Sequence, residues 1–352
     1  MATCDVLLII VAFIPTKKWV DDLKARVPGI EIHIYPTEMY AQEIPNNVPE
    51  DVWFRTTALY TWKAFPTREL APRLQFVQLH SAGCNQILGN PLYEKSEIAF
   101  CTSNGVHPPQ ITEWVFATFL GFQHHFQEHF ENQRKNNWVD PSSDEDVEDA
   151  VGLRVGIMGY GSIGRQVARV SKAFGMDVHA YTLHERSTPE SRRQNGFTEP
   201  GLGDPEGQFP SKWFHGKEQL KDFLTSDLDL LVITLPQTPQ TTNLIGKEEF
   251  AWLERKKTFL SNVGRGVAVD GEALIAALDA GQIRGAALDV TNPEPLPANS
   301  KLWNYKNVVI TPHCAGNSNH FNERTLNILS HNLERRAKGL EVVNRVSKSL
   351  GY

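Results

Sequence analysis

Three side chains with complementary chemistry follow predicted strands in the second half of the chain. Arg265, Glu294 and His313 each come at or just beyond the carboxyl end of such a strand, the edge at which open α/β sheets bind ligands. A histidine titrates near neutrality and suits proton donation, and a neighbouring carboxylate favours its protonated form. An arginine offers a planar, permanently charged fork for an anionic substrate. We therefore predict that these three residues form a catalytic set.

A second chemical signal is the GxGxxG motif Gly159-Tyr160-Gly161-Ser162-Ile163-Gly164, which separates a predicted strand from a predicted helix. Gly159 permits the tight turn, Gly161 lets the backbone approach a pyrophosphate, and Gly164 lets helix and strand pack closely. The helix N-terminus then favours the phosphates. We predict a bound dinucleotide here; the alternative is a glycine-rich turn without a ligand.

The next predicted strand indicates which dinucleotide is bound. NAD sites usually place an acid at its tip, but this strand ends at Thr182 without one. Arg186 and Ser187 follow, and an arginine fork matches a 2′-phosphate. We expect these three residues to contact the cofactor and NADP(H) to be preferred. In the alternative, NAD(H) binds, Arg186 and Arg192 are solvated charges and Glu185 holds the ribose.

Together with the glycine motif, the ordered segments 262–266, 288–297 and 311–313 resemble the D-2-hydroxyacid dehydrogenase family, the D-isomer-specific NAD(P)-dependent enzymes. The resemblance spans nearly the whole chain. It implies an α/β fold of two Rossmann-like domains, whose parallel sheets flank an active-site cleft. Residues 1–105 and 319–352 would form the substrate-binding domain, and residues 106–318 the dinucleotide-binding domain.

The resemblance also implies roles for individual residues. The family's matching arginine contacts the substrate carboxylate and carbonyl, so Arg265 and His313 are expected to touch the substrate. The turn Ser81-Ala82-Gly83 matches the loop whose backbone N–H groups hold that carboxylate. Asp289 matches the position that contacts the nicotinamide carboxamide. The remaining cofactor-binding residues expected from the resemblance are Pro236, Thr238 and Val263.

The activity that the resemblance implies is the reduction of 2-keto acids to D-2-hydroxy acids by hydride transfer from NAD(P)H, with NADPH preferred. Formate dehydrogenases pair their histidine with glutamine, so Glu294 argues against formate. The segment 181–186 looks more like that of the NADPH-dependent glyoxylate and hydroxypyruvate reductases. Two alternatives stay open: a dinucleotide-sensing binding protein, such as the corepressors of this fold, and a formate- or phosphite-type dehydrogenase.

The elements that must position these residues alternate along the chain, as in a parallel sheet with crossover helices. A helix over 163–174 follows the glycine motif, and a longer helix with an aromatic face is expected over 111–133, packing against a sheet or a partner subunit.

The segment 194–217 is rich in Gly and Pro and is expected to be a surface excursion or a flap. Trp53, Phe54, Tyr60 and Trp62 could line an apolar pocket, but we expect most of them in the core. Strands are predicted over 6–14, 31–35, 75–79, 154–158, 177–182, 228–235, 257–263, 283–290 and 307–311.

Composition excludes several other classes. The chain has 352 residues, 41% of them hydrophobic, and a formal net charge of −6, so neither wholesale disorder nor a nucleic-acid partner is expected. The longest apolar run, 6–14, is far shorter than the roughly 20 residues of a membrane helix. The four cysteines are scattered without a CxxC pair, so we expect no metal site and a reducing, cytoplasmic compartment. The resemblance implies a homodimer through the cofactor domain.

Overall fold

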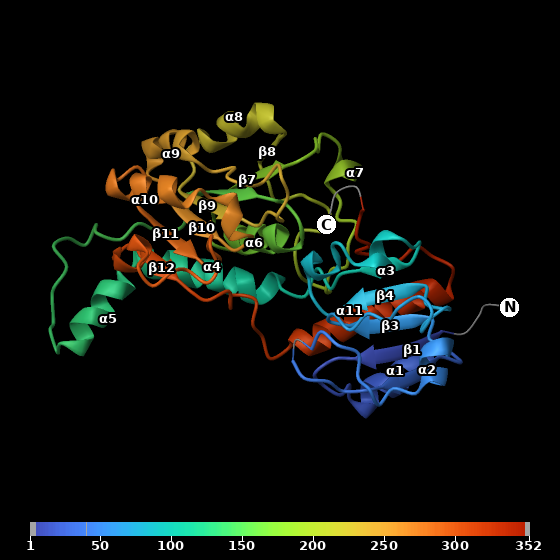
Figure 1. The fold of residues 1–352 in the computed structure, drawn as a ribbon. Helices are drawn as coiled ribbons and strands as arrows, with labels where there is room; N and C mark the ends of the chain where they lie inside the picture. Colours follow the sequence, from blue (N-terminus) through green and yellow to red (C-terminus); the bar gives the residue numbers. More distant parts are fainter. Residues whose placement is uncertain (1–4, 40, 349–352) are drawn as a thin grey trace. The chain divides into compact units, whose positions relative to one another are not determined.

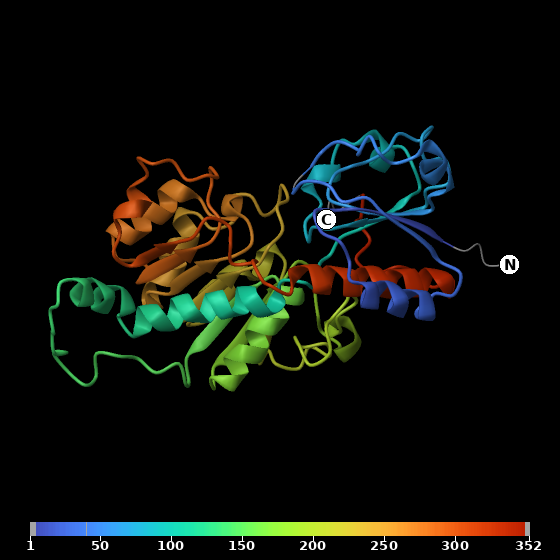
Figure 2. The same cartoon turned by 90° about the horizontal axis from the view of Figure 1, so that it is seen from below.

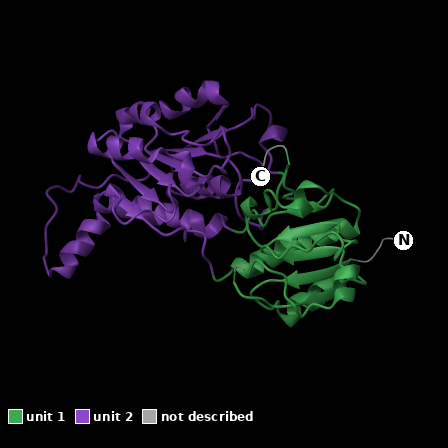
Figure 3. Ribbon diagram, in the orientation of Figure 1, with its two compact units in different colours: residues 1–106, 195–197, 319–352 green, residues 107–194, 198–318 purple. Residues whose placement is uncertain are grey.

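A computed structural model describes residues 5–39 and 41–348, and the chain divides into two compact units (Figure 3). Unit 1 comprises residues 1–106, 195–197 and 319–352, and unit 2 comprises residues 107–194 and 198–318. Each unit contains one sheet of parallel strands with helices packed against it, and most of these elements are labelled in Figure 1. The predicted fold class, α/β with two Rossmann-like domains, is therefore confirmed.

Unit 1 is built on a five-stranded sheet in the order β2-β1-β3-β4-β5, one of the two common doubly wound orders. Figure 2 shows the last helix, α11, beside α1, where Trp19 Nε1 donates to Ser330 Oγ at 3.1 Å. The elements of unit 1 are β1 Val6–Ile10, α1 Lys17–Arg26, β2 Glu31–Ile34, α2 Glu50–Arg55, β3 Ala58–Thr61, β4 Phe76–Leu79, η1 Asn85–Ile87, α3 Pro91–Glu94, β5 Ala99–Cys101 and α11 Phe321–Ala337.

Unit 2 is built on a seven-stranded sheet in the order β12-β11-β10-β9-β6-β7-β8. The order reverses between β6 and β9, and such a switch point is where open α/β sheets bind their ligands. The elements are α4 Pro108–Gln123, α5 Phe126–Arg134, β6 Arg154–Met158, α6 Ser162–Ala173, β7 Asp177–Thr182, α7 Pro189–Arg192, β8 Lys212–His215, η2 Lys217–Gln219, α8 Leu220–Leu224, β9 Leu230–Ile233, α9 Lys247–Leu253, η3 Glu254–Lys256, β10 Phe259–Asn262, η4 Gly266–Ala268, α10 Gly271–Asp279, β11 Gly285–Leu288, η5 Lys301–Asn304 and β12 Val308–Ile310.

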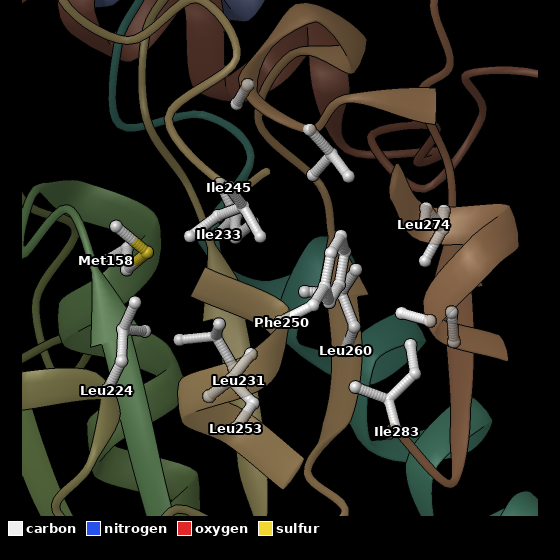
Figure 4. Close-up of a cluster of buried hydrophobic side chains, with 14 of the residues drawn as sticks. Met158, Leu224, Leu231, Ile233, Ile245, Phe250, Leu253, Leu260, Leu274 and Ile283 are labelled. Atoms are coloured by element: carbon white, nitrogen blue, oxygen red, sulfur yellow. The ribbon is translucent and has the colours of Figure 1, made fainter. Parts of the chain in front are cut away.

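The sheet of unit 2 separates two hydrophobic clusters. Along β9, Leu230 and Val232 face one cluster, while Leu231 and Ile233 face the other, which Figure 4 shows together with Phe250 of α9. A strand covered on both faces must be apolar at every position, and this explains the continuous apolar run in the sequence. The two clusters fix the strands whose carboxyl ends carry the predicted catalytic residues.

The structure corrects several predicted elements. The helix expected over 111–133 is broken into α4 and α5, because His125 adopts a left-handed conformation with φ of 54°. The segment 194–217 carries the edge strand β8, and β3 and β5 were not predicted. Trp53 and Tyr60 are buried as expected, whereas Phe54 is exposed. Among the described residues, no helix is long and apolar enough to cross a membrane.

Candidate active site

The glycine turn of unit 2 is shaped by close backbone packing. Gly159 has a φ of 97°, and its carbonyl oxygen accepts a 2.6 Å hydrogen bond from the Thr234 hydroxyl at the end of β9. A Cβ at Gly164 would lie 2.2 Å from the carbonyl oxygen of Gly159, so the helix can follow the turn this closely only with glycine there. Both glycines therefore hold α6 against the carboxyl end of β6.

Gly161 differs from these two glycines, because a Cβ built there would meet no protein atom within 4 Å. Its missing side chain thus leaves open space beside the N-terminus of α6, where no side chain caps the helix. Unpaired N–H groups and the helix dipole favour an anion at such an end. The turn therefore fits the pyrophosphate of a dinucleotide.

Tyr160, which was predicted to bind the cofactor, has its side chain buried in the protein. Its hydroxyl donates to Asp204 Oδ2 at 2.7 Å, and its ring packs edge-on against Trp213 with centroids 4.9 Å apart. Burial, and secondarily the Asp204 carboxylate, raises the pKa of Tyr160, so the phenol stays a hydrogen-bond donor. Any contact of Tyr160 with a cofactor would have to come from its backbone.

Two arginines stand beyond the tip of β7. Arg186 donates through Nη1 to the carbonyl oxygen of Ser191, and Arg192 donates through Nε to the carbonyl oxygen of Arg186 at 2.8 Å. The Thr182 hydroxyl donates to the carbonyl oxygen of His184 at 2.7 Å, and Ser187 is exposed. The loop beyond β7 thus carries two guanidinium groups bonded to main-chain carbonyl oxygens, together with the exposed Glu185.

The turn after β9 and the end of β10 hold three further residues predicted to bind the cofactor. Thr241 Oγ1 accepts from the backbone N–H of Thr238 at 2.9 Å and donates to the carbonyl oxygen of Pro236 at 2.7 Å, which closes the turn. Val263 is buried, and its N–H donates to Ile233 of β9. Both segments lie at the carboxyl edge near the switch point, together with the glycine turn.

Arg265 is held by its backbone. The buried Asn262 side chain donates through Nδ2 to the carbonyl oxygen of Arg265 at 3.1 Å and accepts from the N–H of Gly264 at 3.2 Å. At Gly266, a Cβ would lie 1.9 Å from the carbonyl oxygen of Thr291, so this turn rests directly on the backbone of the turn that follows β11. That next turn leads to Glu294.

Asp289 holds the turn that carries His313. Its buried carboxylate accepts from the Thr311 hydroxyl at 2.6 Å and from the backbone N–H groups of Cys314 and Ala315 at 2.8 and 3.0 Å. Its carbonyl oxygen also accepts from the N–H of His313 at 2.9 Å. Asp289, the residue expected at the nicotinamide carboxamide, thus fixes the backbone on both sides of His313.

The structure brings His313 and Glu294 together. Nδ1 of His313 lies 2.6 Å from Oε1 of Glu294, and the two side chains are 48% and 42% exposed. Nε2 of His313 has no hydrogen-bond partner within residues 5–39 and 41–348, so the ring can present it to a ligand. His313 has a φ of 51°, a conformation that costs a non-glycine residue of order 1–3 kcal/mol and is often found at functional sites.

The predicted carboxylate-binding turn lies in unit 1, directly after β4. Ser81 donates through Oγ to the carbonyl oxygen of Gly83 at 2.7 Å and accepts from Gln86 Nε2, and Ala82 is half-buried between them. The preceding His80 lies among aromatic rings, and burial lowers its pKa to about 4. Its side chain is therefore neutral at neutral pH and does not suit proton donation.

The sequence reasoning missed the residues that act through others. Asn262 supports Arg265, and Thr234 supports Gly159; each is a polar residue within or at the end of an otherwise apolar strand, and that signal could have indicated them. Arg165, buried on α6, could not have been recognised, because its partners are far away in the sequence. Within the part of the chain that the structure describes, no group of three or more His, Cys, Asp or Glu residues could hold a metal ion.

The fold and this edge of the sheet define a dinucleotide-binding oxidoreductase domain. Residues 116–201 and 212–315, more than half of the chain, match the family model described as D-isomer specific 2-hydroxyacid dehydrogenase, NAD binding domain. The chain therefore belongs to the family of D-isomer-specific 2-hydroxyacid dehydrogenases, which are NAD(P)-dependent oxidoreductases.

Solved structures agree with this assignment. A D-isomer-specific 2-hydroxyacid dehydrogenase from Xanthobacter autotrophicus, in complex with NADPH, is 26% identical, with a TM-score of 0.73 over 99% of this chain and 100% of that one. An NADPH-dependent glyoxylate/hydroxypyruvate reductase from Sinorhizobium meliloti, in complex with NADP, is 25% identical, with a TM-score of 0.71 over 99% and 100%. An NAD-complexed dehydrogenase from Lactobacillus delbrueckii, 21% identical with a TM-score of 0.72 over 97% and 100%, shares the fold.

Proposed function

We propose that this enzyme reduces a 2-keto acid to the D-2-hydroxy acid and prefers NADPH to NADH. The observation that carries the reaction type is the 2.6 Å contact of Glu294 with His313 in a left-handed turn, beside a turn that carries Arg265. A histidine held by a carboxylate at one ring nitrogen and open at the other is suited to deliver a proton to a developing alkoxide.

The chain's own residues divide the remaining work. Arg265 would bind the substrate carboxylate and polarise the carbonyl, because its charge grows more favourable as that oxygen becomes negative. Backbone N–H groups of Ser81, Ala82 and Gly83 would hold the same carboxylate. When bound, the nicotinamide supplies the hydride. The residues that would hold the cofactor are Gly159–Gly164, Thr182, Arg186, Ser187, Pro236, Thr238, Val263 and Asp289.

The NADPH preference is supported by the tip of β7. Arg186 and Arg192 stand there bonded to main-chain carbonyls, and Glu185 is exposed. A 2′-phosphate carries about two negative charges, which guanidinium groups bind in a fork geometry. The Xanthobacter and Sinorhizobium proteins were crystallised with NADPH and NADP, which points in the same direction.

A substrate panel tests the proposal. The enzyme should reduce 2-keto acids ranging from glyoxylate to phenylpyruvate, with higher kcat/KM for NADPH than for NADH and D-configured products on a chiral column. Oxidation of formate or phosphite, measured in the same preparation, should stay at background. Turnover of either anion without any 2-keto acid reduction would overturn the proposed substrate class. Equal kcat/KM for the two cofactors would overturn only the preference.

We also propose that the enzyme is a homodimer through unit 2. Helix α5 has no buried residue, and its Phe126 and Phe130 are 50% and 51% exposed with ring centroids 5.7 Å apart. Trp138 in the following loop is 90% exposed. Large exposed aromatic groups of this kind are typical of protein interfaces. Light scattering should give twice the mass of the chain, and Phe130→Ser with Trp138→Ser should give the single mass. A cytoplasmic location remains a prediction.

A further inference from the structure

The segment between β7 and β8 contains residues 202–211, which separate the two stretches that match the family model. This segment, which the sequence left open as a possible flap, is firmly attached to the protein. The N–H of Gly203 donates to Gln166 Oε1 of α6 at 2.6 Å, and the N–H of Ser211 donates to the carbonyl oxygen of Val178 in β7 at 2.8 Å. A segment anchored in this way does not act as a moving lid, so its role must be a different one.

Asp204 is the centre of the segment and is only 3% exposed. Its carboxylate accepts from the backbone N–H groups of Gln208 and Phe209 at 2.9 and 3.0 Å, and from the hydroxyl of Tyr160. Its carbonyl oxygen accepts from Nη1 of Arg165. A buried carboxylate would be costly without such partners, so these contacts fix the segment to the glycine turn and to α6.

Arg165 connects the segment to the tip of β7. Its guanidinium is buried, lies 5.0 Å from the centroid of the Tyr160 ring, and uses Nη2 to donate to the carbonyl oxygen of Arg192 at 2.6 Å. One planar group therefore bonds the main chain of Asp204 on one side and that of Arg192 on the other. Arg165 acts on the backbone that carries the Arg192 side chain.

Arg192 and Arg186 are fixed in turn. Nε of Arg192 donates to the carbonyl oxygen of Arg186, its guanidinium lies 5.6 Å from the centroid of the Trp213 ring, and Arg186 donates to the carbonyl oxygen of Ser191. Within the described ranges, no carboxylate forms an ion pair with Arg165, Arg186 or Arg192. Carbonyl oxygens orient a guanidinium but leave its charge uncompensated.

The neighbouring Arg193 shows the opposite arrangement. It is exposed, and its Nε lies 2.9 Å from Glu206 Oε2 in an ion pair. Glu206 of the segment 202–211 thus pairs with Arg193, whereas Arg186 and Arg192 are bonded to carbonyl oxygens and keep their charges. A charged site whose side chains are already ordered loses less entropy when it binds an anion.

We propose that Arg165, held by Asp204 of the unmatched segment 202–211, is a positioning residue that fixes Arg192 and Arg186 to select the 2′-phosphate of NADPH. This inference rests on the proposed cofactor preference and explains how the fold produces it. The loop that carries the two arginines is short, and without the Arg165 contact it would lose the hydrogen bond that fixes the main chain of Arg192 to α6. The side chains would then sample several positions, and the phosphate would have to order them.

The experiment measures binding of four ligands to Arg165→Met by titration calorimetry: NADPH, NADH, 2′,5′-ADP and 5′-AMP. Arg165→Met removes the charge-assisted hydrogen bonds to the carbonyl oxygens of Asp204 and Arg192, and is expected to weaken NADPH and 2′,5′-ADP by roughly 10-fold or more. NADH and 5′-AMP, which lack the 2′-phosphate, should change by less than about 3-fold. Their retained binding also shows that the variant is folded.

Two arginines serve as matched controls. Arg169 of α6 also bonds the segment, through Nη1 to the carbonyl oxygen of Gly203 at 3.1 Å, but does not contact Arg192. Arg193 is already paired with Glu206. Arg169→Met and Arg193→Met each remove one positive charge near the site, and both should keep the wild-type ratio of NADPH to NADH affinity. A loss of selectivity in either control would mean that net charge, and not position, decides it.

A double-mutant cycle separates positioning from general destabilisation. If Arg165 acts through Arg192, Arg165→Met should weaken 2′,5′-ADP far less in an Arg192→Met background than in the wild type. Additive losses, or equal losses for all four ligands, would overturn the inference. If Arg165→Met does not fold, Tyr160→Phe removes only one hydroxyl from Asp204 and should lower selectivity by roughly 2- to 3-fold. A wild-type enzyme that binds NADH as tightly as NADPH would instead refute the proposed preference itself.

Discussion

Both sheets carry a histidine beyond the carboxyl end of a strand, and the two histidines have opposite surroundings. His313, after β12 of unit 2, is half-exposed, has a φ of 51° and lies 2.6 Å from a carboxylate. His80, after β4 of unit 1, lies among the rings of Phe13, Tyr60 and Phe321, with centroids 4.9–5.7 Å from its own. Its Nε2 contacts the amide oxygen of Asn322 at 3.2 Å.

The difference shows that the neighbours, and not the position on the sheet, decide what a histidine can do. Burial disfavours the charged imidazole and lowers the pKa of His80 to about 4, although the hydrogen bond to the Asn322 amide acts in the opposite direction. A carboxylate at one nitrogen of His313 orients the ring and leaves the other nitrogen for a substrate. The left-handed backbone of His313 is held by Asp289, whereas His80 continues from its strand with an N–H bond to Thr61.

The strongest test of this contrast exchanges each histidine for glutamine. His313→Gln should lower kcat/KM for 2-keto acid reduction by roughly 10³-fold, since a positioned general acid contributes about 10²–10⁴-fold. NADPH binding should persist, because the cofactor phosphates are bound at the glycine turn. His80→Gln should lower kcat/KM by less than about 10-fold and act mainly on stability. Equal losses in the two variants would remove the distinction.

The second test asks whether the edge of unit 2 binds the substrate anion. Arg265→Ala should raise KM and lower kcat together, with a loss in kcat/KM of roughly 10²–10³-fold, because the contact strengthens as the carbonyl oxygen gains charge. Arg265→Lys should retain only part of the wild-type kcat/KM, since lysine lacks the planar fork of arginine. Arg255, which is exposed and paired with Asp227, is the matched control, and its alanine variant should stay within about 2-fold. Near-normal kcat/KM in Arg265→Ala would contradict the assignment.

A third test removes the charge that distinguishes the two histidines but keeps its shape. Glu294→Gln should lower kcat/KM for reduction by roughly 10- to 100-fold, because the His313 ring loses the charged partner that orients it. The measurement is kcat/KM for reduction and for oxidation in variant and wild type. Equal values in both directions would separate Glu294 from the proton transfer.

Some of the fold could be predicted from local patterns. β6 and β7 have the predicted bounds, 154–158 and 177–182, because each has a clear boundary on either side. β3 and β5 escaped prediction because they are short and have no such boundary. The helix break at His125 depends on a single left-handed residue, which no periodicity indicates.

The candidate site shows the same division. The pairing of Glu294 with His313 was predicted from the order of the segments that carry them and from the complementary chemistry of a carboxylate and an imidazole. The contacts of the supporting residues could not be predicted from the sequence. Asp204 meets Tyr160, 44 positions earlier, only because the segment 202–211 returns to the glycine turn. Such pairings depend on the tertiary fold, so the residue types alone do not indicate them.

The smallest expected effect concerns His80 and the pH dependence of stability. The pKa of His80 is about 4 in the folded protein and near its ordinary 6.5 when unfolded, so between these values the unfolded chain binds more protons. Stability from this group is therefore complete above about pH 6.5 and is lost as the pH falls toward 4. Wild-type Tm, measured by calorimetry without ligands, should fall between pH 7 and pH 5. In His80→Gln, Tm should be a few degrees lower at pH 7 and should fall less, so that the two curves converge.

His179 of β7, whose pKa burial also lowers to about 4, contributes the same slope to both proteins. His129→Gln, an exposed control on α5, should follow the wild type. Parallel curves for His80→Gln and the wild type would show that His80 is charged in the folded state, and the contrast between the two histidines would fail.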